Sequence, residues 1–121
     1  MAAPNLVNVA TITAKSVQAT LDTTLTTEIL ANASSSGKVF KVNAIIVANI
    51  DGSSAADVSV AITKSGGSPI MIASTISVPA DATLVVIDKN SSIYLEEGDN
   101  IEAGASASSD LTITISYEEL S

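Results

Sequence analysis

The sequence predicts an all-β protein, an antiparallel β-sandwich of the jelly-roll type with eight or nine strands. Val, Ile, Thr, Ser and Ala dominate the chain, and β-branched residues favour strands. Several segments alternate apolar and polar residues with a period of two. Turn-forming residues recur between them at short, even intervals, a spacing that is typical of sandwiches.

The length of 121 residues predicts a single domain spanning residues 1–121. Hydrophobic residues make up 46% of the chain but aromatic residues only 2%, so the core is expected to be aliphatic. Residues 1–15 are expected to form an N-terminal arm or a strand exchanged between subunits, because apolar residues from Leu6 to Ala14 fall on both faces of a strand.

The first half-buried strand is predicted where Val17, Ala19 and Leu21 alternate with polar residues. Residues 23–33 have a helical spacing of apolar side chains, but their threonines are poor helix formers, so we predict a strand here as well. The serine-rich stretch Ser34–Gly37 is too short to separate two domains.

Lys38–Ile50 differs from these strands because apolar residues occupy both of its faces. By strict alternation Phe40 and Val42 lie on one face, and Ile45 and Val47 lie on the other. This pattern predicts either a central strand or a strand at a subunit interface.

Two shorter segments, Ile70–Ala73 and Leu84–Ile87, are also apolar on both faces, which suits strands that are covered on both sides or packed against another subunit. The chain carries more two-faced apolar strand than one small sandwich needs. We therefore expect a homo-oligomer, most simply a trimer. Its interface is expected to include Ile45, Val47, Ile70, Ile72, Val85 and Ile87.

The remaining strands alternate more simply. Val58, Val60 and Ile62 face one side, with polar residues between them. The clearest alternation is the last, in which Leu111 and Ile113 begin an apolar face that continues to residue 117. Both patterns predict half-buried antiparallel strands.

The composition argues against catalysis and against nucleic-acid or membrane partners. The chain has no His, Cys, Trp or Arg, and 13 acidic residues against 5 lysines give a net charge of −8. Without His or Cys there is no ordinary base or thiolate nucleophile, and the negative charge repels phosphates and anionic lipids. We predict a non-enzymatic protein with no cofactor, made in the cytoplasm because no signal peptide is evident.

The acidic turns offer the only candidate chemistry. Glu96, Glu97 and Asp99 could supply the paired carboxylates of a hydrolase, but sugar clefts usually also offer aromatic platforms. A solvated turn is the better interpretation. Calcium sites at Asp51 and Asp57, or at Asp99 and Glu102, do not match the spacing of a cation-binding loop, so we predict hairpin turns and no metal site.

Three stretches resemble the small virion proteins of tailed bacteriophages: KVNAIIVANIDGSSAADVSVAI, TISVPADATLVVIDKNSSIYLEEGDNIEA and DLTITISYEEL. The resemblance covers residues Lys38 to Leu120. The turn L-x-x-G-D-x-I at Leu95–Ile101 is also similar to that of trimeric jelly rolls of the tumour-necrosis-factor and complement-globular type. The resemblance implies a β-sandwich that coats or joins parts of a virus particle.

We therefore expect a capsid decoration (cement) protein that binds and stabilises the assembled shell, with itself and the major capsid protein as partners. It would be made in the host cytoplasm and would reside in the virion. A tail, collar or fibre-attachment protein of the same particle is one alternative. A glycan-binding adsorption module is another, although scarce aromatic residues count against it.

Overall fold

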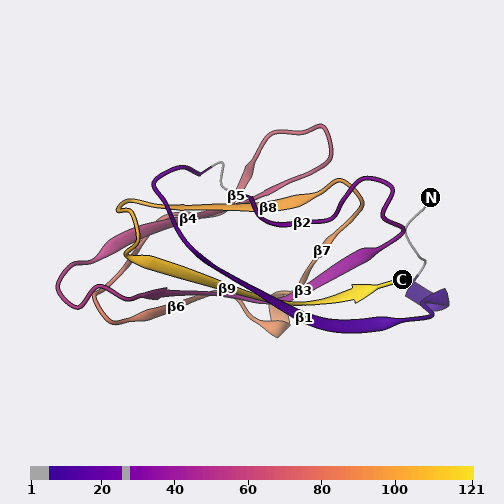
Figure 1. Ribbon diagram of the computed structural model, residues 1–121, viewed down its shortest axis with the longest axis horizontal. Helices are drawn as coiled ribbons and strands as arrows, with labels where there is room; N and C mark the ends of the chain where they lie inside the picture. The colour runs from indigo at the N-terminus through magenta and orange to yellow at the C-terminus, as the bar shows by residue number, and fades with distance from the viewer. Residues whose placement is uncertain (1–5, 26–27) are drawn as a thin grey trace.

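The computed structural model describes residues 6–25 and 28–121 of the 121-residue chain. Its strands form two antiparallel sheets that face each other across an aliphatic core (Figure 1). The predicted all-β antiparallel sandwich is confirmed. The helical segments in the described residues are single 3₁₀ turns, Leu6–Asn8 and Lys89–Ser91, and neither is long enough to cross a membrane.

Nine strands lie in the described part of the chain: β1 (Ile12–Thr20), β2 (Glu28–Ala31), β3 (Val39–Asn49), β4 (Ala56–Thr63), β5 (Ile70–Val78), β6 (Thr83–Ile87), β7 (Ile93–Leu95), β8 (Asn100–Ala105) and β9 (Leu111–Leu120). The first sheet has the order β1-β9-β3-β6, and β7 also pairs with β3. The second sheet has the order β2-β8-β4-β5. Every connection except β4–β5 and β6–β7 crosses from one sheet to the other.

Strands β6 and β7 act as one interrupted strand beside β3. β6 pairs with residues 45–48 and β7 with residues 40–42 of the same strand. Between them, the carboxylate of Asp88 caps a 3₁₀ turn by accepting a hydrogen bond from the backbone N–H of Asn90 at 2.9 Å. Counted in this way, each sheet contains four strands.

The core is formed by the inward faces of both sheets. In β9 the predicted alternation is present, because Leu111, Ile113 and Ile115 are fully buried while the threonines between them are partly exposed. Each such side chain contributes about 1.5–3 kcal/mol by leaving water. The aromatic contribution is small, a tilted contact between Phe40 and Tyr117 with ring centroids 5.2 Å apart. The expectation of an aliphatic core therefore agrees with the packing.

Strand β3 explains the two-faced apolar pattern without a second subunit. Its pairing with β9 shifts register between Val42 and Ala44, which marks a β-bulge at Asn43. One extra residue reverses the alternation, so Val42 faces the core before the bulge and Ile45 and Val47 face the core after it. A central strand was one of the two predictions for this segment, and β3 lies between β9 and β6 in the first sheet. Its apolar side chains before and after Asn43 pack into the same core.

Two buried asparagines fix connections between the sheets. The Asn49 amide donates to the backbone carbonyls of Ser54 and Val78 at 3.0 and 2.9 Å, and its side-chain oxygen accepts from Asp51 N–H at 2.9 Å. Asn32 similarly donates to the carbonyl of Leu95 at 3.1 Å. These amides satisfy backbone groups where the chain leaves one sheet for the other, which buried loops would otherwise leave unpaired.

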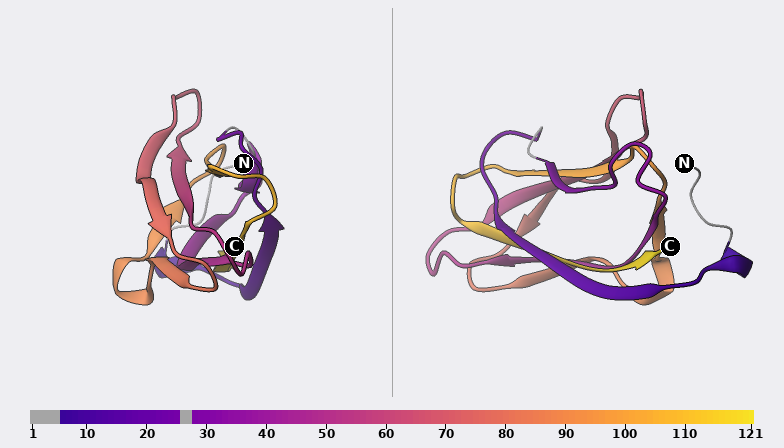
Figure 2. Two further views of the ribbon diagram at one scale, coloured as in Figure 1. Left: turned by 90° about the vertical axis from the view of Figure 1, so that its left-hand side faces the viewer. Right: turned by 45° about the vertical axis from the view of Figure 1, so that its right-hand side comes forward.

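Strand β1 is the edge of the first sheet and pairs with β9 at nine consecutive positions without a register shift. Just before it, the N–H groups of Ala10 and Thr11 donate to the carbonyl of Ser121 at 2.8 and 2.9 Å. Both ends of the described chain therefore lie at one end of the sandwich (Figures 1 and 2). Residues 12–15 of the predicted arm belong to this sheet, residues 1–5 lie outside the described residues, and exchange between subunits stays a prediction.

The segment predicted as a strand over residues 23–33 is a strand only at Glu28–Ala31, and residues 26–27 lie outside the described residues. Before it, the chain from Leu21 crosses onto the outer face of the second sheet. There Thr24 and Leu25 lie directly on Gly104 of β8. A Cβ at Gly104 would lie 3.0 Å from the N and Cα atoms of Leu25. Only glycine leaves room for this crossing.

We predict that Gly104→Ala destabilises the fold by about 1–3 kcal/mol, because the new methyl group meets backbone atoms that cannot rotate away. Gly52→Ala is the matched control, since its Cβ would meet only the Asp81 carboxylate at an ordinary 3.6 Å. Urea denaturation of both variants measures the difference. Equal midpoints for Gly104→Ala and Gly52→Ala would contradict the close packing over β8.

Candidate interaction surface

The structure separates the six predicted interface residues into two groups. Ile45 and Val47 are fully buried and Ile87 is 6% exposed, all within the core of this chain. Because these three side chains are buried within one chain, they leave almost no surface for contact with another subunit. In contrast, Ile70 and Val85 are 64% and 55% exposed, and Ile72 is half-buried. The predicted interface role rests on these three residues.

Ile70, Met71, Ile72 and Ile76 of β5, together with Val85 of β6, form what we call the apolar flank. β5 is the edge of the second sheet and β6 the edge of the first, and a short turn joins them. The two strands therefore lie along one long side of the sandwich, opposite β1 (Figure 2, left). Met71 and Ile76 are 39% and 41% exposed, so exposed apolar side chains recur along β5 as far as the turn to β6, with Ser74, Thr75 and Ser77 among them.

The apolar flank is also depleted of charge. Asp81 is the only charged residue between Lys64 and Asp88, although the chain has 18 charged residues in all, 13 acidic and 5 basic. Exposed aliphatic side chains without interspersed charge are typical of the buried centre of a protein interface. The flank has the chemistry of a surface that is covered in an assembly.

The backbone of β5 limits how such a partner would bind. Its pairing with β4 shifts register twice, and Thr75 has a positive φ of 47°. Irregularities of this kind protect an edge strand from the addition of another strand. Contact at the flank would therefore be made by packed side chains.

The acidic turn between β7 and β8 has a structural role that differs from the predicted solvated turn. Asp99 is 1% exposed, and its carboxylate accepts hydrogen bonds from the backbone N–H groups of Glu96 and Ser65 at 2.8 and 3.0 Å. It also forms a salt bridge with Lys64, and this hydrogen bond raises the pKa of Lys64 above its usual value. Asp99 thus joins the β7–β8 turn to the β4–β5 turn.

Of the two neighbouring carboxylates, that of Glu97 has its own partner, whereas that of Glu96 shares Lys64 with Asp99. Glu97 accepts from the backbone N–H of Gly37 at 3.0 Å, and the exposed Glu96 pairs with Lys64 at 3.0 Å. Glu96 and Asp99 therefore share the Lys64 ammonium, and Glu97 is held by the Gly37 backbone, so all three carboxylates are engaged in contacts within the chain. The three residues act as anchors between loops.

Apart from Asp57, the acidic residues considered as calcium ligands are also engaged by other groups. Asp51 accepts from the N–H and hydroxyl of Ser53, both at 3.1 Å, and so organises its own turn. Glu102 accepts from the Thr63 hydroxyl at 2.8 Å. Over residues 6–25 and 28–121, no three acidic side chains gather closely enough to hold a metal ion.

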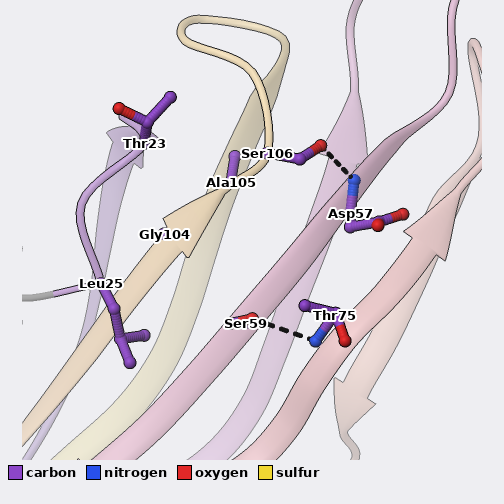
Figure 3. Close-up of a pocket in the computed structure, with 8 residues that line it drawn as sticks. All are labelled: Thr23, Leu25, Asp57, Ser59, Thr75, Gly104, Ala105 and Ser106. Carbon is purple, nitrogen blue, oxygen red and sulfur yellow. Dashed lines mark hydrogen bonds between the residues drawn. The ribbon is translucent and has the colours of Figure 1, made fainter.

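A second feature, a cavity of about 210 Å³, lies on the outer face of the second sheet. The segment from Thr23 to Leu25 forms one wall, and residues of β4 and β5 form the other, with β8 as the floor (Figure 3). The lining residues are Thr23, Leu25, Asp57, Ser59, Thr75, Gly104, Ala105 and Ser106. Four of these side chains carry hydroxyl groups.

The chain was compared with known proteins. No protein-family model and no curated protein matches the sequence.

Sequence reasoning placed three residues of the apolar flank but missed the cavity. Asp57 and Ser59 were recognisable as the polar face of a half-buried strand. Their convergence with Thr23 and Ser106 depends on the crossing of residues 21–25 over Gly104, which brings together segments far apart in the sequence. The one available signal was an isolated glycine within a strand pattern, which often marks close backbone approach.

Near the chain ends, Glu119 pairs with Lys15 at 3.1 Å and with Lys38 at 3.2 Å. Burial alone would raise the pKa of Glu119, but the hydrogen bonds from both lysines outweigh it and lower the pKa below the usual 4.5. A lowered pKa in the folded state means that this group stabilises the fold at neutral pH. That contribution is lost as the pH falls through the lowered value.

We predict that the double variant Lys15→Gln, Lys38→Gln is slightly less stable than the parent at pH 7, and that it loses less stability than the parent as the pH falls below 4.5. Each exposed pair is worth only about 0.2–1 kcal/mol, so urea midpoints should be measured in low salt. Lys89→Gln, which removes a lysine with no ion pair among the described residues, is the control. Identical pH profiles for all three proteins would show that the Glu119 pairs do not contribute.

Proposed function

We propose that this protein is a non-enzymatic structural component of a phage virion, a jelly roll that decorates the capsid and holds neighbouring subunits of the shell together. The jelly-roll assignment is supported by the strand order. The first and last strands, β1 and β9, lie side by side, and the chain crosses repeatedly between two sheets of four strands when β6 and β7 are counted together. Jelly rolls are common in viral capsid proteins.

The single observation that carries the functional proposal is the apolar flank. A protein of net charge −8 that leaves Ile70, Ile76 and Val85 exposed on two strands whose only nearby charge in sequence is Asp81 has a surface suited to burial against protein. The stretches that resemble phage virion proteins include the end of β5 and all of β6, as well as most of β3 and all of β9. Two residues of the apolar flank, Ile76 and Val85, therefore lie within the stretches that resemble phage virion proteins.

In the proposed assembly, copies of the chain associate through the apolar flank, most simply as a trimer, and the oligomer binds the major capsid protein. The acidic residues outside the flank keep free oligomers apart from one another by charge repulsion. A decoration protein that binds the assembled shell and not its separate subunits stabilises the shell by mass action. Repeated weak contacts on a symmetric lattice add avidity, so no single strong site is required.

Substituting a flank residue should separate assembly from folding. We predict that Val85→Asp dissociates the oligomer, because a charge placed in a packed apolar interface finds no partner there. Val85 is 55% exposed in the single chain, so the change should leave the fold intact. Light scattering measures the mass, and far-ultraviolet circular dichroism checks the fold.

Thr20→Asp, on the exposed edge strand β1 of the opposite side, is the matched control and should leave the oligomer unchanged. Ile45→Asp places a charge in the core and should unfold the chain instead. If Val85→Asp and the parent protein have the same mass, the flank is not the assembly surface.

Decoration itself can be tested on capsids that lack this protein. We predict that the purified protein binds them saturably and raises the temperature at which they are disrupted, as expected when a ligand binds only the assembled state. The Val85→Asp variant should bind more weakly. Binding confined to the tail vertex would assign the protein to the tail or collar instead, and no binding to the particle would reject a role in the virion.

A further inference from the structure

The cavity on the outer face of the second sheet is lined by residues that can form hydrogen bonds. None of the residues of the apolar flank belongs to this lining. The lining residues include Thr23, Ser59, Thr75 and Ser106, which carry hydroxyl groups, and Asp57. We propose that this cavity, here called the hydroxyl pocket, binds a single neutral sugar ring. This inference goes beyond the proposed function and does not depend on it.

Two of the hydroxyl groups are fixed in position by the backbone. The Ser59 oxygen accepts a hydrogen bond from the N–H of Thr75 at 3.0 Å, and the Ser106 oxygen accepts from the N–H of Asp57 at 2.8 Å (Figure 3). Because each oxygen already accepts from the backbone, its O–H proton remains to be donated. These serines are therefore preorganised donors that ligand oxygens can meet.

The carboxylate of Asp57, at the edge of the pocket and turned away from Leu25 toward β5, supplies the complementary acceptor (Figure 3). Among the described residues, no side chain donates a hydrogen bond to it and no lysine pairs with it. It is half-buried, so it has lost part of its hydration without gaining a protein partner. Two adjacent hydroxyl groups of a sugar can donate to its two oxygens together, and hydrogen bonds to a charged acceptor are stronger than neutral ones.

The lining favours a neutral polyol over a metal ion. A hard cation such as Ca²⁺ takes about 6–8 oxygen ligands, often from several carboxylates. The hydroxyl pocket offers one carboxylate, and no acidic cluster suited to a metal occurs in the described residues. Hydroxyl groups that can both donate and accept match the alternating donors and acceptors around a sugar ring.

The size and the apolar wall of the hydroxyl pocket limit the ligand to one ring. Its volume of about 210 Å³ is below the roughly 300–1,000 Å³ of pockets that hold drug-sized molecules. Leu25 stands on the wall opposite Thr75 and gives the C–H face of a ring an apolar contact (Figure 3). With no aromatic ring in the lining, we expect millimolar affinity, about 1–10 mM for so small a ligand.

The test is titration of the isotopically labelled full chain with glucose, galactose, mannose and N-acetylglucosamine, followed by NMR. At least one sugar should cause saturable shifts of the backbone amides of Asp57 and Thr75, which report directly on the Ser106 and Ser59 hydroxyls. Asp57→Asn keeps the shape of the side chain but removes its charge. It should weaken binding by about tenfold or more, the usual cost of losing charged hydrogen bonds.

Asp81→Asn is the matched control, because Asp81 is an exposed aspartate outside the lining and asparagine tolerates its positive φ of 59°. It should bind as the parent protein does. Absence of saturable shifts with all four sugars at about 100 mM, far above the expected dissociation constant, would overturn the proposal. Equal binding by Asp57→Asn and the parent would overturn it as well. Neither result bears on the capsid experiment, so failure of the two proposals can be distinguished.

Discussion

The fold depends above all on the pairing of β3 with β9. These strands are joined at ten positions although about 60 residues separate them in the chain. β1 attaches to the far side of β9, and β6 and β7 attach to the far side of β3, so the first sheet is organised around this one pair. The inward faces of the pair, including Ile45 and Ile115, also supply the part of the core that the second sheet covers. Backbone pairing and hydrophobic burial therefore support each other at the same residues.

The sequence predicted the strands whose alternation is unbroken. β4 and β9 were recognisable because apolar and polar residues alternate through nearly their whole length. β3 was misread in one respect, since a single extra residue at Asn43 reverses the face of every later side chain. A period of two assigns Ile45 and Val47 to the face opposite Val42, whereas the bulge returns them to the core. Such a bulge is set by pairing with β9 and leaves little trace in the local sequence.

The candidate sites show the same distinction between local and long-range information. The apolar flank could be anticipated because Ile70, Ile72 and Val85 lie in segments that are apolar on both faces of a strand, a property that is visible along the chain. The burial of Asp99 and the formation of the hydroxyl pocket could not be anticipated in this way. Asp99 needs the β4–β5 turn to reach it with Lys64, and the pocket needs residues 21–25 to cross Gly104. Both depend on which loops meet once the sheets are packed.

The position of β9 has a consequence for how the protein is made. Strand β9 lies between β1 and β3, so during synthesis β1 and one edge of β3 stay unpaired until β9 emerges. At the usual 5–20 residues per second, the roughly 60 residues between β3 and β9 take about 3–12 s to synthesise. Pairing between such distant segments is intrinsically slow, and unpaired edges are prone to join other chains in the meantime. The first sheet therefore exposes unpaired strand edges for as long as β9 is missing.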